Sequence, residues 1–172
     1  MSDALWVGFT VFLGVTQALQ VALLGAMNRA RGPSEAAYLS ILGTVVGISL
    51  VLTLRSVLGS RPLLPPPADH PAVTGAAALL SGVLLVLVLR GLPGFYAVTG
   101  MLAVPYLFAA SYLAPKIGIG LFLAAIIAGQ LSGGVLLDHL GAFGAATRSI
   151  DAVRLIGVVA LLAGVVLVRG FR

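Results

Sequence analysis

The sequence predicts an all-α integral membrane protein, a helical bundle with six (alternatively five) transmembrane helices in one domain covering residues 1–172. Hydrophobic residues make up 60% of the chain and charged residues only 9%, and the mean hydropathy is +1.15. A soluble domain needs about a quarter charged residues to keep its surface hydrated. A chain with so few charges is expected to use lipid as the solvent for its outer face.

Six apolar stretches come close to the length of about 20 residues that a transmembrane helix needs. In chain order, the predicted helices cover residues 5–26, 36–54, 72–89, 95–113, 118–137 and 153–168. The last is the shortest, at about 16 residues or roughly 24 Å of helix. Arg154 and Arg169 near its ends are expected to extend toward the membrane surface and compensate for this length.

Arginine, glycine and proline mark the breaks between the stretches. The segment 29–33 ends the first helix, and Ser34 is the expected N-cap of the second. Prolines in the segment 65–71 predict a rigid loop, and the segments 90–94 and 115–116 separate the later helices. Pro105 falls inside the fourth predicted helix, where it removes a backbone hydrogen bond and predicts a kink.

The ten lysines and arginines are scattered between apolar runs, which excludes a basic nucleic-acid-binding surface. We interpret them as anchors at the membrane surface. With no cysteine in the sequence, disulfides and thiolate metal sites are excluded. No cofactor, metal or nucleic-acid partner is predicted.

The basic residues do not favour either orientation in the membrane. With six spans, the side holding both termini carries five basic residues, namely Arg55, Arg61, Lys116, Arg169 and Arg172. The opposite side also carries five, namely Arg29, Arg31, Arg90, Arg148 and Arg154. Either one or two charges near the first helix decide insertion, or copies insert both ways and pair antiparallel.

Polar side chains form a stripe on the first predicted helix. Thr10, Gln17 and Asn28 fall near one face, with Gln20 about 80° away from Thr10. One explanation is hydrogen bonding that holds helices together, at about 0.6 kcal/mol per bond. The alternative is that Gln17 and Gln20 line a substrate pathway.

Gln130 is the most informative residue of the fifth predicted helix. Hydrocarbon cannot solvate its amide, so the side chain must face protein, water or cargo. Ala125, Gly129 and Gly133 repeat at four-residue spacing, which predicts close helix packing. The same packing pattern recurs on the second and last helices at Gly43, Gly47, Ala160 and Gly164.

Charged residues gather where the fifth helix ends and the sixth begins. Asp138 and His139 close one helix, and Arg154 opens the next. One interpretation is a latch in which Asp138 pairs with Arg154 and fixes the hairpin. The other is a proton-coupled gate, because histidine titrates near neutral pH.

The sequence gives little support for a catalytic site. Ser132 and His139 are seven residues apart, or about 10.5 Å along a helix, which exceeds the reach of a nucleophile and its base. No metal-ligand spacing and no phosphate-binding glycine loop is present. We therefore do not expect an enzyme.

A series of motifs runs in order through residues 92–169. They are Pro93, Pro115-Lys116-Ile117-Gly118, Ala128-Gly129-Gln130, Asp138-His139-Leu140-Gly141, Arg154-Leu155-Ile156-Gly157 and the run from Gly164 to Arg169. In order and spacing they resemble the drug/metabolite transporter superfamily, in its single-domain inner-membrane exporter branch.

The N-terminal part fits this branch more loosely. Gln20 takes the place of the family's glutamine, but Leu24 stands where an asparagine is expected. The stretch 72–89 resembles an extra helix relative to the usual five. Members of the branch occur as single genes, pairs and fused proteins, which implies pairing between two antiparallel halves.

Together these observations predict a multi-pass transporter of the bacterial inner membrane. We expect it to move a small molecule by alternating access, as a homodimer or paralogous heterodimer in the lipid bilayer. In this hypothesis Gln17, Gln20 and Gln130 line the path, and Asp138, His139 and Arg154 form the gate or latch. The alternative is a membrane scaffold or assembly subunit that transports nothing, with the glutamines sealed in tight helix contacts.

Overall fold

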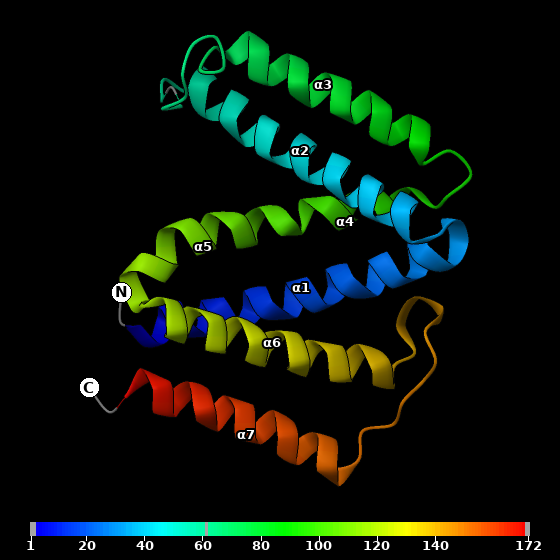
Figure 1. The fold of residues 1–172 in the computed structure, drawn as a ribbon, viewed down its shortest axis with the longest axis vertical. Helices are drawn as coiled ribbons and strands as arrows, with labels where there is room; N and C mark the ends of the chain where they lie inside the picture. The colour runs from blue at the N-terminus through cyan, green and yellow to red at the C-terminus, as the bar shows by residue number, and fades with distance from the viewer. Residues whose placement is uncertain (1–2, 61, 171–172) are drawn as a thin grey trace. The chain divides into compact units, whose positions relative to one another are not determined.

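A computed structural model of the chain describes residues 3–60 and 62–170. Within these residues the protein contains α-helices and two short 3-10 helices but no strand (Figure 1). Six of the helical segments are long and apolar enough to cross a membrane. The predicted all-α class with six spans is therefore confirmed.

The chain divides into two compact units. One, here called the terminal unit, combines Met1–Ala26 with Pro105–Arg172, and the other, the central unit, is Met27–Val104. Helix α1 (Asp3–Arg31) supplies residues to both units, as does α5 (Ala103–Ile117).

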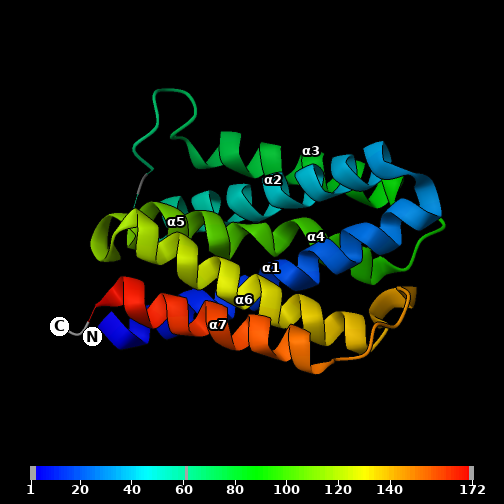
Figure 2. The same cartoon turned by 60° about the horizontal axis from the view of Figure 1, so that its bottom comes forward.

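The terminal unit is built from most of α1 and α5 together with α6 (Ile119–His139) and α7 (Ala152–Arg169). Helices α6 and α7 lie side by side and run antiparallel (Figures 1 and 2). Apolar side chains from α1, α5 and α6 form one buried cluster, which contains Leu13, Ala109, Leu113, Phe122 and Ile126. A smaller cluster joins α6 to α7 through Ala125, Ala128 and Val165.

Helices α1 and α6 cross at glycines that leave no room for a side chain. A Cβ added to Gly129 would collide with the Val11 carbonyl oxygen and lie 2.9 Å from the Gly14 Cα. A Cβ on Gly133 would lie 3.0 Å from that of Ala18. The structure thus places two of the predicted packing glycines at this crossing.

The central unit contains α2 (Pro33–Val57), α3 (Pro71–Val88), a 3-10 turn (Gly94–Ala97) and the short α4 (Val98–Met101). Helices α2 and α3 are antiparallel neighbours, linked by a 2.8 Å hydrogen bond from the Thr53 hydroxyl to that of Thr74. A Cβ on Gly43 would lie 3.0 Å from the Gly100 Cα, and one on Gly47 would lie 2.7 Å from Val104 Cγ2. Both glycines therefore sit at close helix contacts.

Several helix ends differ from the prediction. Helix α1 continues to Arg31 and α5 continues through Pro115 to Ile117. The apolar run ends earlier than the helix because backbone hydrogen bonds continue into the polar interface, where charged side chains are solvated. Ser34 is not the N-cap of α2. That position belongs to Gly32, whose φ of 95° suits glycine, and Pro33 takes the first helical position.

The fourth predicted helix, 95–113, is interrupted. Its first part is the 3-10 turn and α4, and Leu102 then separates α4 from α5. Pro105 lies three residues further on and has no N–H to donate to the Met101 carbonyl, which explains the break.

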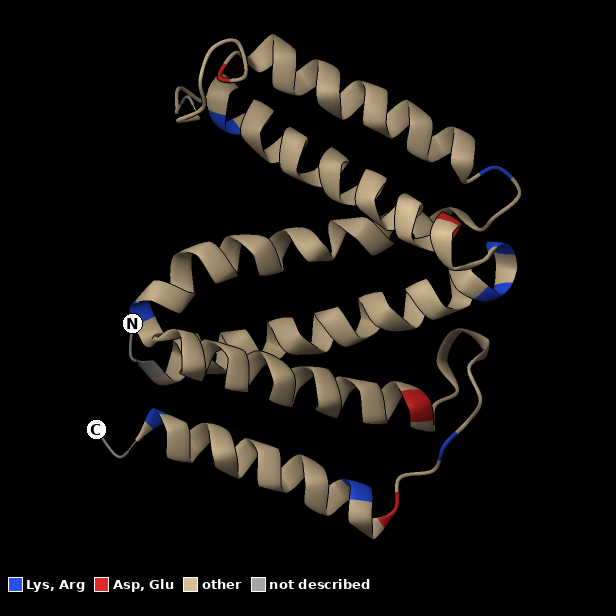
Figure 3. Cartoon of the chain, in the orientation of Figure 1, with Lys and Arg blue, Asp and Glu red and all other residues tan. Residues whose placement is uncertain are grey.

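Charged residues lie at helix ends and in the connecting segments (Figure 3). Arg61 and Arg172, two members of the charge count, are outside the described residues. His70 acts as the N-cap of α3, because its Nδ1 accepts a hydrogen bond from the Ala72 N–H at 3.2 Å.

Candidate functional site

Gln130 occupies the middle of α6, one residue from the centre of the helix bounded by Ile119 and His139. Its side chain is half-buried and lines two cavities in the terminal unit. Both cavities are also lined by Leu131 and Gly134, the neighbouring residues on the same stretch of α6.

The first cavity, of about 350 Å³, lies between α1 and α6. Apart from the Gln130 amide its lining is apolar, with Ala18 and Val21 from α1 and Ile127 from α6. Gln130 is thus the polar side chain of an otherwise apolar space.

The second cavity, of about 380 Å³, lies between α6 and α7. It extends from Gln130 to Asp138 at the end of α6 and to Arg154 and Gly157 on α7. Gln130 and Asp138 are eight residues apart, or about 12 Å along the helix axis. This cavity therefore connects the middle of a membrane helix to charged groups at its end.

Two glycines keep the second cavity open. A Cβ added to Gly134 or to Gly157 would meet no atom within 4 Å. Residues 133 and 134 are adjacent glycines with opposite roles: one packs against α1, while the other leaves space beside Gln130. The sequence shows the doublet but does not show which glycine faces the cavity.

Asp138 and Arg154 face one another at the charged end of this cavity. Arg154 Nη1 lies 3.8 Å from Asp138 Oδ2, and the two side chains are 30% and 47% exposed respectively. That nitrogen is itself buried and makes no hydrogen bond to the part of the chain that the structure describes. A partly exposed ion pair at this distance contributes only about 0–1 kcal/mol to stability, so it can open at little cost.

The segment between α6 and α7 folds back on the end of α6. The Arg148 N–H donates to the Asp138 carbonyl at 2.9 Å, and the Ile150 N–H lies 3.4 Å from His139 Nδ1. Asp151 caps α7 by accepting the Arg154 N–H at 2.8 Å. His139 is exposed and does not line either cavity, so it holds the connecting segment instead of facing the cavity.

Gln17 and Gln20 do not line either of these cavities, although both are half-buried. The α1 residues that do are Ala18 and Val21. At about 100° per residue, Gln17 points away from the face that Ala18 presents, and Gln20 points further away. Of the three glutamines predicted to line one path, Gln130 borders these two cavities, and a pathway role for Gln17 and Gln20 stays a prediction.

Three other residues singled out in the sequence can be placed in the structure: two hydroxyl groups bond within their own helices, and one glycine has no close neighbour. Thr10 is fully buried and donates to the Trp6 carbonyl at 2.8 Å. Ser132 donates to the Ala128 carbonyl at 2.7 Å. A Cβ on Gly164 would meet no atom within 4 Å, so the predicted packing contact is not formed there within the described chain.

The described residues do not bring three or more histidine, cysteine, aspartate or glutamate side chains together as metal ligands. What the α6–α7 cavity offers is a neutral amide at membrane depth and a pair of opposite charges at its end. This arrangement offers both polar and charged groups to a small molecule inside the cavity.

One comparison with known proteins covers nearly the whole chain. The model of a protein family described as "Putative inner membrane exporter, YdcZ" matches residues 5–167. No curated protein and no solved structure gives a significant match. The family match includes the helix over 72–89 and the N-terminal helix. The chain therefore belongs to the YdcZ family of drug/metabolite transporters, and it is a multi-pass protein of the inner membrane.

Proposed function

We propose that the protein exports a small molecule by alternating access, with the cavity between α6 and α7 as part of the substrate path. The observation that carries this proposal is a single cavity joining Gln130, at membrane depth, to Asp138 and Arg154 at the helix end. An amide at that depth needs a polar neighbour, and an accessible cavity supplies one in the form of water or cargo.

The Asp138–Arg154 pair acts as the gate in this proposal. The two groups face one another across the mouth between α6 and α7, and their weak, partly exposed contact costs little to break. Its opening would separate the start of α7 from the end of α6 while the hydrogen bonds from Arg148 and Ile150 keep the connecting segment attached.

The proposed cargo is a neutral or zwitterionic small molecule. The cavity volume of about 380 Å³ falls in the range of about 300–1,000 Å³ that is typical of small-molecule sites. A path with one positive and one negative group at its end matches a cargo whose own charges cancel.

We further propose that the working unit is an antiparallel dimer, of two identical chains or of paralogues. Only 6% of the most apolar window of α7 is buried, against 22% to 39% for the other five spans. Helix α7 therefore has the surface available for a partner, and the balance of five basic residues on each side permits insertion in both orientations.

Cysteine labelling tests whether Gln130 faces water. The chain has no native cysteine, so Gln130→Cys introduces a unique thiol. A membrane-impermeant methanethiosulfonate reacts with the thiolate, which forms in water and not in hydrocarbon. The control is Leu123→Cys on the same helix, which is exposed and lines neither cavity. We expect Gln130→Cys to react at least about tenfold faster; equally slow reaction at both positions would contradict the proposal.

A flux assay separates a transporter from a scaffold. Proteoliposomes are loaded with a defined mixture of neutral and zwitterionic metabolites, and mass spectrometry measures what leaves. We expect at least one compound to leave faster than from protein-free vesicles, and Gln130→Leu to slow it by about tenfold, the effect of losing one hydrogen bond of about 1.4 kcal/mol to the cargo. Asp138→Asn should also change the rate, because it removes the charge that faces Arg154. Ser132→Ala is the control, because its hydroxyl bonds within α6. Wild-type flux equal to the background would favour the scaffold.

A further inference from the structure

An apolar groove runs along the central unit, apart from the proposed substrate path. It lies between α2 and α3 and has a volume of about 590 Å³. Its lining contains no charged residue and includes Leu50, Gly75, Ala78, Gly82, Val86 and Leu87. Small residues on α3 form its floor, and larger exposed ones such as Val83 and Val86 flank it.

The dimensions of this groove match one hydrocarbon chain. From Gly75 to Leu87 it follows twelve residues of α3, or about 18 Å. One leaflet of a bilayer contributes about 15 Å of hydrocarbon. The groove is open along one side, so an extended acyl chain can lie along it between the side chains that flank it.

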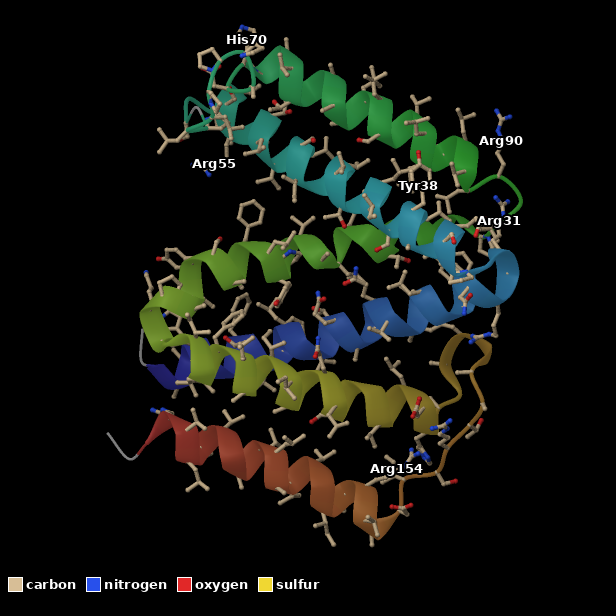
Figure 4. All side chains as sticks on the ribbon, in the orientation of Figure 1. Arg31, Tyr38, Arg55, His70, Arg90 and Arg154 are labelled. Atoms are coloured by element: carbon tan, nitrogen blue, oxygen red, sulfur yellow. The ribbon has the colours of Figure 1, made fainter. Side chains whose placement is uncertain are left out.

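Two arginines lie just beyond the Leu87 end of the groove. Arg31 Nη1 donates to the Val88 carbonyl at 2.8 Å, and its Nη2 donates to the Arg90 carbonyl. Arg90 is exposed, and its side chain lies at the same end of α3 as that of Arg31 (Figure 4). Neither arginine forms an ion pair with an acidic residue in the described ranges, so their charges stay available to an anion.

We propose that this groove binds one anionic phospholipid, with an acyl chain between α2 and α3 and the phosphate beside Arg31 and Arg90. The apolar lining selects a hydrocarbon chain over polar cargo, and the two arginines at the same end of α3 favour a negative headgroup. Arg31 also satisfies carbonyls at the C-terminal end of α3, so the lipid site is fixed to the end of this helix.

Two variants separate the acyl chain from the headgroup. A Cβ added to Gly82 would approach only Val46 Cγ2, at 4.0 Å, so Gly82→Leu fills the groove without a backbone clash. Arg90→Gln removes the exposed charge and keeps the backbone carbonyl that Arg31 contacts. The matched controls are Gly120→Leu, at a glycine with no neighbour within 4 Å, and Arg55→Gln, which removes an exposed cation from the other end of α2.

The measurement is native mass spectrometry of the full chain with equal amounts of phosphatidylglycerol and phosphatidylethanolamine carrying the same acyl chains. We expect the wild type and both controls to retain one phosphatidylglycerol in preference to phosphatidylethanolamine. Gly82→Leu should lose the bound lipid. Arg90→Gln should reduce the headgroup preference about fivefold, the factor for about 1 kcal/mol per basic residue at an anionic surface.

Three outcomes would overturn the lipid site. The first is equal lipid retention by the wild type and Gly82→Leu, and the second is the absence of a headgroup preference in the wild type. The third is a smaller dimer fraction in Gly82→Leu with unchanged lipid, which would assign the groove to a protein contact. The readout does not depend on transport, and a negative result leaves the proposed path between α6 and α7 unaffected.

Discussion

Individual glycines decide where α6 packs tightly and where it leaves space. Gly129 permits contact with the α1 backbone at Val11 and Gly14, and Gly133 permits contact with the Val15 backbone and the Ala18 Cβ, whereas Gly134 borders the cavities beside Gln130. A side chain costs most where the neighbour is backbone, because backbone cannot change rotamer to make room. The same residue type therefore has opposite consequences within one turn of the helix.

Gly129→Ala should destabilise the protein. The new Cβ would collide with the Val11 carbonyl oxygen, and overpacking of this kind costs about 1–3 kcal/mol, more than the gain of about 1 kcal/mol in helix propensity. Gly120→Ala is the control, because a Cβ there meets no atom within 4 Å. Thermal unfolding in detergent should show a lower Tm for Gly129→Ala and an equal or higher Tm for Gly120→Ala. Equal stability of the two variants would show that the crossing is looser than described.

The sequence identifies Gln130 as a candidate residue but does not orient the glutamines of α1. A lone amide in an apolar helix stands out by its solvation cost alone. Orientation is harder to predict, because lipid and protein interior are both apolar and hydrophobic periodicity does not distinguish them. Ala18 and Val21, which line a cavity with Gln130, look like ordinary lipid-facing residues in the sequence.

Among the helices, α7 is held by contacts around its first turn more than by buried side chains. Its apolar window is only 6% buried, so packing within the chain provides little stabilisation. The Asp151 side chain caps its first turn by accepting the Arg154 N–H, and the Arg148 N–H ties the preceding segment to α6. The helix cap thus also helps to hold Arg154 at the cavity.

Asp151→Ala should loosen the start of α7. Loss of an N-cap costs about 1 kcal/mol, whereas Asp151→Asn keeps an oxygen acceptor and should behave like the wild type. Hydrogen exchange of the amides at 152–155 should therefore quicken about fivefold in the alanine variant alone. Asp138→Asn provides a second comparison, because its partly exposed ion pair contributes little. Unchanged exchange in Asp151→Ala would mean that another contact holds this turn.

The existence of each helix could be predicted from hydropathy, while helix ends depend on local backbone chemistry. An apolar run reports only the part of a helix inside hydrocarbon, and α1 and α5 continue beyond it to Arg31 and Ile117. Proline gave a clearer signal: Pro105 predicted an interruption, and the structure has one at Leu102. Pro115 did not mark the end of the helix, since α5 continues to Ile117 and stops before Gly118.

For the whole molecule, the balance of basic residues is the property that bears on assembly. The structure provides six helices able to cross the membrane, and with six crossings each side carries five basic residues. Neither orientation then has an electrostatic advantage. Insertion in both directions would give every copy an inverted partner, which the proposed antiparallel dimer requires.

One added charge should tip this balance in a direction set by its position. Ser60→Lys raises the count to six on the side that holds both termini, and Ala146→Lys raises it to six on the other; both positions are exposed and non-helical. Because the more basic side stays in the cytoplasm, Ser60→Lys should raise the signal of a C-terminal green fluorescent protein. Ala146→Lys should instead raise that of a C-terminal alkaline phosphatase, and the wild type should score with both. The contrary outcome is a wild type that scores with one reporter only, with neither lysine changing the ratio of the two reporter signals. The chain would then insert in a single orientation, and the antiparallel dimer would require a paralogue of opposite charge bias.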